Sequence, residues 1–205
     1  MYKKIIVFEG IDGSGKTFHL NEVSKYLNKK KIKFIKFREP GGTRNSEVIR
    51  NIILSDKSTF KKKTDFLLYL AARNENYESL IKPNINKKVI LIDRFIDSTI
   101  AYQVDGKKVK RSFIDHLHKF ILKGIKPNIT FILKVSPKAS KLRLKKRKTK
   151  NRYDNFSQSF YTKAQKSFLK IAKNKKNYFV LDSSSNTNEL EKKIFKIVSR
   201  YLKIQ

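Results

Sequence analysis

The segment Gly10–Thr17, with the sequence GIDGSGKT, matches the phosphate-binding pattern G-x-x-x-x-G-K-[ST]. It directly follows a short apolar run and leads into a helical pattern, which is the context that this motif requires. Glycines let backbone N–H groups curl around phosphate oxygens, and the start of the following helix adds partial positive charge. The motif predicts a site for the phosphates of ATP or GTP, formed by Gly10, Ile11, Asp12, Gly13, Ser14, Gly15, Lys16 and Thr17.

Two residues of this loop and one acid farther along the chain suit phosphoryl transfer. Lys16 is expected to reach the β- and γ-phosphates as a catalytic residue, and the Thr17 hydroxyl is expected to bind Mg²⁺. Asp93 ends the apolar run Val89–Ile92, so we expect it beside the phosphate loop, supporting Mg²⁺ directly or through water. The alternative for Asp93 is an ordinary turn residue at the end of a strand.

The phosphate loop alone does not identify the group that receives the phosphoryl group. No guanine-reading N-K-x-D segment is present, which disfavours a GTPase. A chain of 205 residues is also short for a larger ATPase motor. A small chain with many arginines favours a kinase of small metabolites.

Four further segments carry polar residues that have no obvious role in packing. They are Arg38–Thr43 (REPGGT), Leu67–Arg73 (LLYLAAR), Asp93–Gln103 (DRFIDSTIAYQ) and Asn151–Asp154 (NRYD). Together with the phosphate loop, they resemble the thymidylate kinase family in order and spacing, over essentially the whole chain. The REPGGT and DRFIDSTIAYQ segments are specific to that family, whereas the phosphate loop is not.

The resemblance implies an α/β protein with a P-loop kinase fold: a five-stranded parallel sheet flanked by helices on both faces, with a mobile lid. It also implies transfer of the γ-phosphoryl group of ATP to dTMP, giving dTDP and ADP, with ATP as co-substrate and Mg²⁺ as cofactor. The acceptor phosphate has a second pKa of about 6 and is mostly dianionic near neutral pH, so no strong general base is needed. The alternatives are a P-loop kinase of another nucleotide or nucleoside, and a nucleic-acid-binding NTPase that only the charge favours.

The resemblance further implies which residues bind the acceptor phosphate and the sugar. Arg94 would hold the phosphate near the transfer point as a catalytic residue, and Arg38 and Arg50 would help to bind it. Glu39 would lie beside this phosphate. Asp12 matches the carboxylate of the family that contacts the 3′-hydroxyl of the sugar.

The same comparison implies a pocket for thymine and deoxyribose. Arg73, Thr99 and Gln103 would form hydrogen bonds with the edge of the base. Tyr69, one helical turn before Arg73, would stack on the base, and its hydroxyl would then need a partner or water. Tyr102 would pack under the deoxyribose and disfavour a 2′-hydroxyl.

Several of these residues also have a purely structural interpretation. Tyr69 on a helix could belong to the hydrophobic core, and Arg50 could form a surface ion pair. Thr99 and Gln103 could be ordinary polar residues of a helix. Arg38 and Arg94 are less easily explained in this way, because they follow strands of a parallel sheet, where such sheets bind their ligands.

A basic run from Arg143 to Arg152 follows the fourth apolar run of the chain. By resemblance it belongs to the lid over the ATP phosphates, about residues 143–154. The variable positions of the phosphate loop contain no arginine, so a catalytic arginine is expected from the lid, and Arg147 and Arg152 are the candidates. Arg143 is assigned to ATP binding from its position alone.

The positions of these residues depend on the secondary structure that the sequence predicts. Near-continuous apolar runs predict strands at Lys4–Glu9, Phe34–Arg38, Val89–Asp93, Ile129–Val135 and Tyr178–Asp182. Helical patterns lie between them, at Lys16–Asn28, Ser46–Leu54, Asp65–Ile81, Ser112–Leu122, Pro137–Arg147, Phe160–Ala172 and Glu189–Leu202. Thr64 is expected to cap the third of these helices and Gly124 to end the fourth. Alternating strands and helices predict a parallel sheet, and we expect residues 1–205 to form a single domain.

The composition excludes several kinds of site. The formal net charge is +32, but lysine dominates and is spread along the chain, which favours a solvated surface produced by compositional bias. A surface for polyanions is the alternative, and no specific nucleic-acid partner is expected. The chain has no cysteine and three histidines, which excludes disulfides, thiolate metal sites and a cysteine nucleophile.

The sequence also leads to expectations about location and assembly. The first apolar run, Ile5–Phe8, is shorter than the apolar region of roughly 7–15 residues in a signal peptide. No window approaches the roughly 18 uncharged apolar residues of a membrane span. We therefore expect a cytoplasmic protein without a membrane partner, and the resemblance implies a homodimer.

Overall fold

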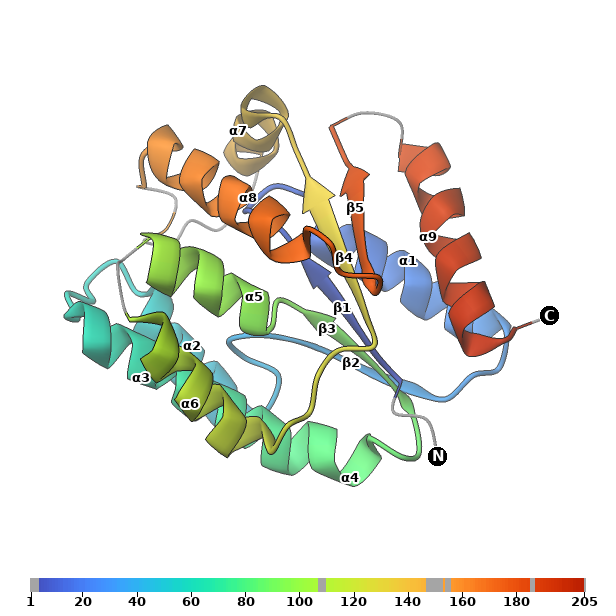
Figure 1. Ribbon diagram of the computed structural model, residues 1–205, viewed down its shortest axis with the longest axis horizontal. Helices are drawn as coiled ribbons and strands as arrows, with labels where there is room; N and C mark the ends of the chain where they lie inside the picture. The colour runs from blue at the N-terminus through green and yellow to red at the C-terminus, as the bar shows by residue number, and fades with distance from the viewer. Residues whose placement is uncertain (1–3, 107–109, 147–152, 154–155, 185–186, 205) are drawn as a thin grey trace.

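The computed structural model describes residues 4–106, 110–146, 153, 156–184 and 187–204. Its centre is a sheet of five strands in the order β2-β3-β1-β4-β5, in which every pair of neighbours is parallel (Figure 1). The strands are β1 (Ile5–Glu9), β2 (Phe34–Arg38), β3 (Val89–Asp93), β4 (Ile129–Lys134) and β5 (Tyr178–Asp182). The predicted five-stranded parallel sheet with helices on both faces is thus confirmed, and each strand lies within one residue of its predicted bounds.

The register of the strands brings charged residues to one edge of the sheet. Arg38 at the end of β2 pairs with Asp93 at the end of β3, and Phe8 of β1 also pairs with Asp93. Glu9 is therefore at the same edge, one residue beyond Phe8. Because parallel strands all end at this edge, the loops that follow them meet there.

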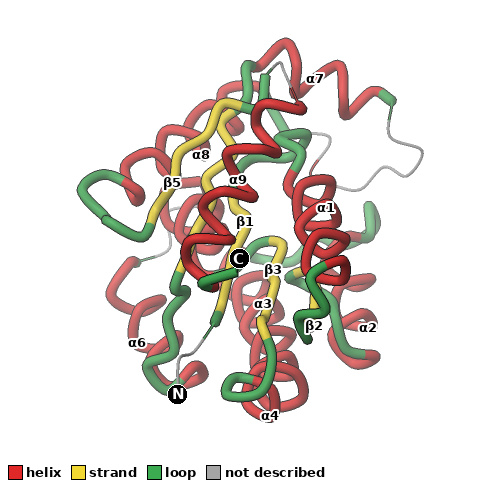
Figure 2. Tube along the Cα trace, turned by 90° about the vertical axis from the view of Figure 1, so that its right-hand side faces the viewer, coloured by secondary structure: helices red, strands yellow, loops and turns green. Residues whose placement is uncertain are grey.

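One face of the sheet is covered by α1 (Lys16–Lys29) and α9 (Thr187–Leu202), which lie side by side in front of the strands in Figure 2. Leu20, Val23 and Leu27 of α1 share a hydrophobic cluster with inward-facing side chains of the strands. The two helices also touch each other, since the Tyr26 hydroxyl is 2.6 Å from that of Ser199.

The other face is covered by α3, α6 and α8 together with the segment after β3 (Figure 1). Phe66 and Leu70 of α3 and Ile114 of α6 pack against Ile90 and Ile92 of β3, among others. Beyond the helices already given, the bounds are α2 (Arg44–Leu54), α3 (Lys62–Asn76), α4 (Lys82–Asn84), α5 (Ile96–Thr99), α6 (Arg111–Leu122), α7 (Pro137–Lys145) and α8 (Gln158–Ala172).

The structure corrects the predicted helices at several points. The helix expected over Asp65–Ile81 begins earlier, after Lys61, and continues after Asn76 as a π-helical turn, η1 (Tyr77–Ile81), so the predicted Thr64 cap is wrong. The helix α5 and the following π-helical turn η2 (Ile100–Gly106) were not predicted. The helix α6 ends at Lys123, which is left-handed with φ 47°, and the predicted Gly124 follows it with a positive φ of 79°. The predicted end of α7 at Arg147 lies outside the described residues.

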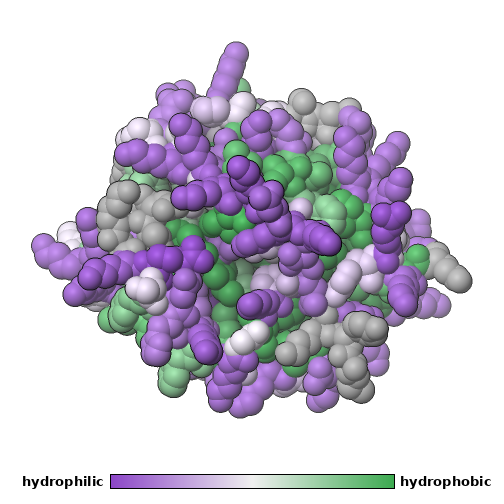
Figure 3. Space-filling view, in the orientation of Figure 1, coloured by the Kyte–Doolittle hydropathy of each residue, from purple (hydrophilic) through white to green (hydrophobic). Residues whose placement is uncertain are grey.

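Hydrophilic side chains are spread over the whole visible face of the molecule in Figure 3, with hydrophobic ones between them. This distribution agrees with a solvated, lysine-rich surface. In the ranges that the structure describes, none of the helices combines the length and the apolar character needed to cross a membrane.

Candidate active site

The phosphate loop joins β1 to α1 and has a backbone that only glycine adopts easily. Gly10 has φ 139°, and a Cβ atom there would lie 2.5 Å from the carbonyl oxygen of Leu133. The Lys16 ammonium lies over the loop and donates to the carbonyl oxygen of Ile11 at 2.9 Å. Burial, assisted by the charge of Arg94, lowers the pKa of Lys16 to about 8, so the ammonium is still mostly protonated at neutral pH. The loop therefore offers backbone donors and a buried positive charge.

Thr17 and Asp93 meet at the start of α1. The Thr17 hydroxyl donates to Oδ2 of Asp93 over 2.5 Å, which joins the phosphate loop to the end of β3. Both side chains offer hard oxygen ligands, which suit Mg²⁺. In the described ranges there is no group of three or more His, Cys, Asp or Glu side chains that could hold a metal ion. A site with few protein ligands is typical of Mg²⁺ that is bound largely through substrate phosphates.

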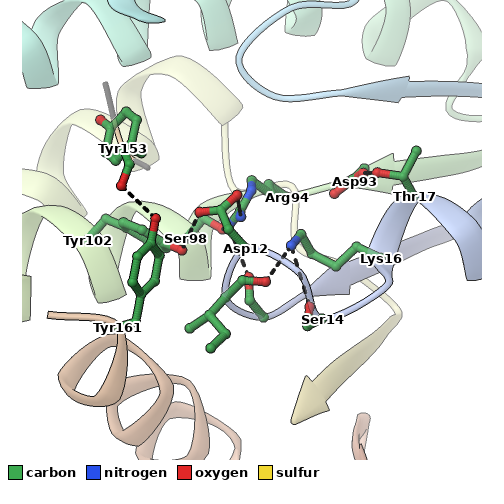
Figure 4. A network of polar contacts seen from close by, with 12 residues as sticks. Asp12, Ser14, Lys16, Thr17, Asp93, Arg94, Ser98, Tyr102, Tyr153 and Tyr161 are labelled. Atoms are coloured by element: carbon green, nitrogen blue, oxygen red, sulfur yellow. Dashed lines mark hydrogen bonds and ion pairs between the residues drawn. The ribbon is translucent and has the colours of Figure 1, made fainter. Parts of the chain in front are cut away.

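Arg94 follows β3 and reaches back to the phosphate loop (Figure 4). Its guanidinium donates to the carbonyl oxygen of Gly10 at 3.0 Å and forms an ion pair with Asp12 at 2.9 Å. It also lies 5.3 Å from the ring centroid of Tyr102. Burial alone would lower the pKa of Arg94, but the charges of Asp12 and of the other acidic groups around it together outweigh burial and raise the pKa well above the ordinary value. A permanent positive charge therefore stands next to the phosphate loop.

The backbone of Arg94 is left-handed, with φ 68°, a conformation that costs about 1–3 kcal/mol for a residue with a side chain. Glu9 holds the loop in this shape. Its Oε1 atom accepts from the backbone N–H of Phe95 at 2.8 Å and of Ser98 at 3.1 Å, and its Oε2 atom accepts from the Ser98 hydroxyl. The Ser98 hydroxyl in turn accepts from Arg94 at 3.1 Å.

Glu9 was not among the predicted site residues, although both Glu9 and Asp93 follow buried apolar runs and so carried the same sequence signal. The Glu9 side chain is fully buried. Burial, together with the nearby carboxylate of Asp97, raises the pKa of Glu9 to about 7. A carboxyl group that links the end of β1 to the loop of Arg94 therefore titrates close to neutral pH.

Arg73 of α3 lies at the other end of the site and is only 3% exposed. Its Nε atom donates to Glu39 at 2.7 Å, and its Nη2 atom donates to the carbonyl oxygen of Phe95 at 2.9 Å. Its Nη1 atom donates to the Thr99 hydroxyl at 2.9 Å and lies 2.5 Å from Nε2 of His118. His118 was not predicted as a site residue.

Two adjoining clefts contain almost all of these side chains. The first cleft is lined by Asp12, Glu39, Arg50, Tyr69, Arg73, Arg94, Thr99, Tyr102 and Gln103, with Pro40, Leu54, Phe95, Ser98 and Tyr153 in addition. The second cleft is lined by the phosphate loop with Asp93 and Arg143, and it shares Asp12, Glu39, Arg50 and Arg94 with the first. We call them the acceptor cleft and the donor cleft. Of the residues predicted for the acceptor, only Arg38 lines the donor cleft alone.

Arg38 and Arg50 are less deeply placed than Arg73. Arg38 is exposed and donates to Glu47 at 3.0 Å on the surface. Arg50 donates to the carbonyl oxygen of Pro40 at 2.6 Å and lines both clefts. The structure thus places Arg50 where the two clefts meet, whereas the exposed Arg38 lines the donor cleft only.

Tyr69 and Gln103, which are predicted to contact the base, both line the acceptor cleft. The Tyr69 hydroxyl finds a partner in the Tyr153 hydroxyl, 2.5 Å away. The Gln103 amide donates to Asp65 at 3.4 Å, because a carboxylate can only accept, and this leaves Oε1 of Gln103 buried without a partner in the described part of the chain. The acceptor cleft is therefore lined by an aromatic ring, that of Tyr69, and by a side chain, that of Gln103, whose acceptor has no partner among the described residues.

The predicted lid is described only in part. Arg143 of α7 donates to the carbonyl oxygens of Gly13 at 3.1 Å and Ser183 at 2.6 Å, beside the phosphate loop. Tyr153 packs edge-on against Tyr102. The two candidate catalytic arginines, Arg147 and Arg152, lie outside the described residues.

Comparisons with known proteins agree on one family. A family model described as thymidylate kinase matches residues 8–194. The chain is 37% identical to a thymidylate kinase of Thermosipho africanus over 198 residues, which cover 96% of this chain and 98% of that protein. It is 38% identical to that of Thermosipho melanesiensis with the same coverage. The crystal structure of thymidylate kinase from Ehrlichia chaffeensis is similar with a TM-score of 0.78 and 32% identity, covering 95% of this chain and 98% of the other.

Proposed function

We propose a division of roles among the described residues from the premise that this chain belongs to the thymidylate kinase family. The protein is a dTMP kinase: it transfers the γ-phosphoryl group of ATP to dTMP, giving ADP and dTDP, and it uses Mg²⁺. Because the chain belongs to this family, dTMP kinase activity is favoured over the two alternatives, a kinase of another nucleotide and a nucleic-acid-binding NTPase. The roles of individual residues are the proposal.

The observation that carries the proposal is the wall shared by the two clefts. Four side chains, Asp12, Glu39, Arg50 and Arg94, line both the cleft over the phosphate loop and the cleft that contains Arg73, and the two guanidinium groups supply the positive charge there. ATP in the donor cleft and dTMP in the acceptor cleft would bring their phosphates together at this wall. Two polyanions repel each other, so fixed positive charge at their meeting point is what the reaction requires.

On the donor side, we assign the ATP phosphates to the backbone of Gly10–Thr17 and to Lys16. Arg143, which already contacts Gly13, would lie against the nucleotide at the outer edge of this loop. Thr17 and Asp93 would hold Mg²⁺. When bound, the metal ion would withdraw negative charge from the phosphate oxygens.

On the acceptor side, the nucleophile is an oxygen of the dTMP phosphate. This phosphate is largely dianionic at neutral pH because its second pKa is about 6, so it attacks without losing a proton to the protein. Arg94 would hold it in line with the γ-phosphate, and Arg50 would support it. Arg38 keeps the phosphate-binding role that the family resemblance implies. Glu39, which lines both clefts, would lie beside the phosphate on the side where it pairs with Arg73.

We assign the thymine base to the deep end of the acceptor cleft. Four of the five N–H groups of Arg73 meet acceptors in the described part of the chain, which leaves one for the ligand. Thymine presents an N3–H donor between two carbonyl oxygens. The unused Oε1 atom of Gln103 suits the donor, and the free N–H of Arg73 suits a carbonyl oxygen. Thr99 keeps the base-edge role that the family resemblance implies, and Tyr69 would stack on the ring.

Asp12 and Tyr102 would recognise the sugar. The Tyr102 hydroxyl donates to Oδ2 of Asp12 over 3.2 Å, and Asp12 is the carboxylate that the resemblance assigns to the 3′-hydroxyl. The Tyr102 ring beside them would occupy the space of a 2′-hydroxyl. This arrangement supports a preference for deoxyribose.

The catalytic arginine of the lid, about residues 143–154, stays a prediction for Arg147 or Arg152. We also propose that residues 1–205 form one domain, because its hydrophobic clusters all pack against a single sheet. A cytoplasmic location stays a prediction that cell fractionation would check.

We propose that the protein forms a homodimer. Its interface would contain the exposed apolar side chains of the neighbouring helices α2, α3 and α6 (Figure 1). These side chains are Val48, Ile52, Leu67, Phe113 and Phe120, and Phe120 is 75% exposed. Exposed apolar patches of this kind mark protein interfaces. We expect analytical ultracentrifugation to show a dimer, and Leu67→Asp to shift it towards monomer; a wild-type monomer would contradict the proposal.

A reciprocal pair of variants tests the division into two clefts. Gln103 lines only the acceptor cleft and Thr17 only the donor cleft. We expect Gln103→Leu to raise the KM for dTMP by about tenfold and to leave the KM for ATP unchanged, since a buried hydrogen bond to the ligand is lost. Thr17→Val should raise the KM for Mg-ATP and leave that for dTMP unchanged.

Each variant is the control of the other, because both remove one polar group from a folded site. Steady-state rates with varied dTMP and varied ATP provide the measurement. If Gln103→Leu affected both KM values equally, the assignment of the base to the acceptor cleft would be wrong.

A further inference from the structure

One partner of Arg73 comes from a helix that carries none of the family motifs. His118 lies on α6 and is 5% exposed. It belongs to the inward-facing stripe of that helix, together with Ile114, Ile121 and Leu122. An aliphatic side chain would fill such a position without a polar atom to satisfy, so packing alone does not explain a histidine there.

The chemistry of the contact fixes the state of the imidazole. A guanidinium has only donors, so Nε2 of His118, 2.5 Å from Nη1 of Arg73, must be the acceptor. The ring proton is therefore on Nδ1. Burial, together with the charge of Arg73, lowers the pKa of His118 to about 2, so the ring stays neutral at physiological pH.

We propose that His118 is a positioning residue that fixes the Arg73 guanidinium in the orientation that reads thymine. The proposal rests on the assignment of Arg73 to the base. Glu39 fixes the Nε side of the guanidinium and Phe95 binds Nη2, but only Thr99 would remain on Nη1 without His118. With only one hydrogen bond to Nη1, the guanidinium could tilt, and its remaining N–H would no longer point towards the ligand.

The competing explanation is that His118 only fills space between α6 and α3. The two explanations differ in which kinetic constant responds. A positioning residue acts through Arg73, so its loss affects dTMP binding and requires Arg73. A space-filling residue affects the stability of the fold and both substrates alike, whatever stands at position 73.

The experiment compares His118→Phe, which removes the acceptor, with His118→Gln, which restores one at a similar distance. His116→Phe is the matched control, because His116 lies on the same helix and is exposed. Each substitution is also made in an Arg73→Lys background. KM for dTMP, KM for ATP, kcat and the melting temperature are measured for every variant.

We expect His118→Phe to raise the KM for dTMP by about tenfold, with the KM for ATP unchanged, because a hydrogen bond to a charged group is lost. His118→Gln should recover most of this loss, and His116→Phe should have no effect. In the Arg73→Lys background, His118→Phe should add little, because the oriented guanidinium is already absent. If His118→Phe does not fold, His118→Met takes its place, since Met accepts only weakly.

Equal changes in both KM values, a loss that persists in the Arg73→Lys background, or an unchanged KM for dTMP would each overturn the proposal. The Arg73→Lys variant alone separates this failure from that of the proposed function. If Arg73→Lys leaves the KM for dTMP unchanged, the assignment of Arg73 to the base is wrong. If Arg73→Lys raises it and His118→Phe does not, only the role of His118 is wrong.

Discussion

We call the part of the acceptor cleft around Arg73 the base end and the part around Arg94 the phosphate end, after the roles that we propose for them. The two ends hold their arginines in different ways. At the base end, Arg73 and Glu39 form an ion pair in which the side chains are 3% and 4% exposed. At the phosphate end, Arg94 and Asp12 form a pair that is 17% and 23% exposed, on a strained backbone. We infer that the base end is complete before dTMP binds, whereas the phosphate end is held by contacts that incoming phosphates can replace.

The largest effect that this comparison predicts is on turnover at the phosphate end. Arg94→Lys keeps one positive charge but loses the fork that reaches both Gly10 and Asp12. We expect kcat to fall by ~10³–10⁵, as for other arginines that stabilise phosphoryl transfer, because lysine is a point charge. The melting temperature should change far less than turnover, because the lysine ammonium keeps a positive charge beside Asp12.

Rapid-quench measurement of a single turnover checks this prediction, and circular dichroism confirms the fold of the variant. The exposed Arg38→Lys is a useful control at the rim of the donor cleft, where the loss should be far smaller. A turnover number within tenfold of the wild type for Arg94→Lys would remove Arg94 from the transfer point.

The base end should respond in the opposite way, with a loss of stability. Arg73→Met leaves Glu39 buried without its cation, and removing one partner of a buried pair costs about 3–5 kcal/mol. Chemical denaturation provides the measurement. The double variant Arg73→Met/Glu39→Gln should recover much of the loss, because no uncompensated charge remains. If Arg73→Met were as stable as the wild type, the description of the base end as a preformed buried pair would be wrong.

The sequence predicts the phosphate end better than the base end, for physical reasons. The loop Gly10–Thr17 and the strand ends are local patterns, so their geometry follows from neighbouring residues. The contact between Arg73 and His118 spans 45 positions and depends on how α6 packs against α3. A histidine in the apolar stripe of a helix indicates a buried polar contact, but the sequence does not show which residue provides it.

The segment after β3 was missed for a different reason. It has only four residues of α-helix, Ile96–Thr99, followed by π-helical turns, so the usual 3.6-residue spacing of apolar side chains is absent. The family motif placed Thr99 and Gln103 in the site without predicting the element that carries them. The contacts of Glu9 with this segment could not be foreseen from spacing alone.

Titration offers a finer test, because the two ends should depend on pH with opposite signs. Glu9, at the phosphate end, has its pKa raised from 4.5 to about 7, so the folded state binds more protons and stability falls as pH rises across this window. His118, at the base end, has its pKa lowered from 6.5 to about 2, so stability falls as pH drops below 6.5. Each slope is at most about 1.4 kcal/mol per pH unit.

Variants separate the two contributions between pH values of about 5 and 7. Relative to Glu9→Gln, the wild type should gain free energy of unfolding as the pH falls. Relative to His118→Gln, it should lose free energy of unfolding over the same interval. Urea denaturation at a series of pH values gives both differences, and slopes of the same sign would contradict the comparison.

The smallest expected effect concerns the hydroxyl that links the base end to residue 153. Tyr69→Phe keeps the ring that we assign to stacking on thymine and removes the hydroxyl that donates to the Tyr153 hydroxyl. We expect a loss of about 1 kcal/mol in the free energy of unfolding, typical of one hydrogen bond. Tyr26→Phe, which breaks the similar hydroxyl pair with Ser199 far from the site, is the matched control.

The kinetic constants then show what the hydroxyl does beyond stability. If the ring alone serves the base, the KM for dTMP should stay within about threefold of the wild type in both variants, because stacking depends on area and geometry. A rise in the KM for dTMP with Tyr69→Phe alone would instead mean that the base end is not complete by itself. The base end would then depend on the contact between Tyr69 and Tyr153. On this side of the cleft, it would not be preformed, and the contrast with the phosphate end would not hold.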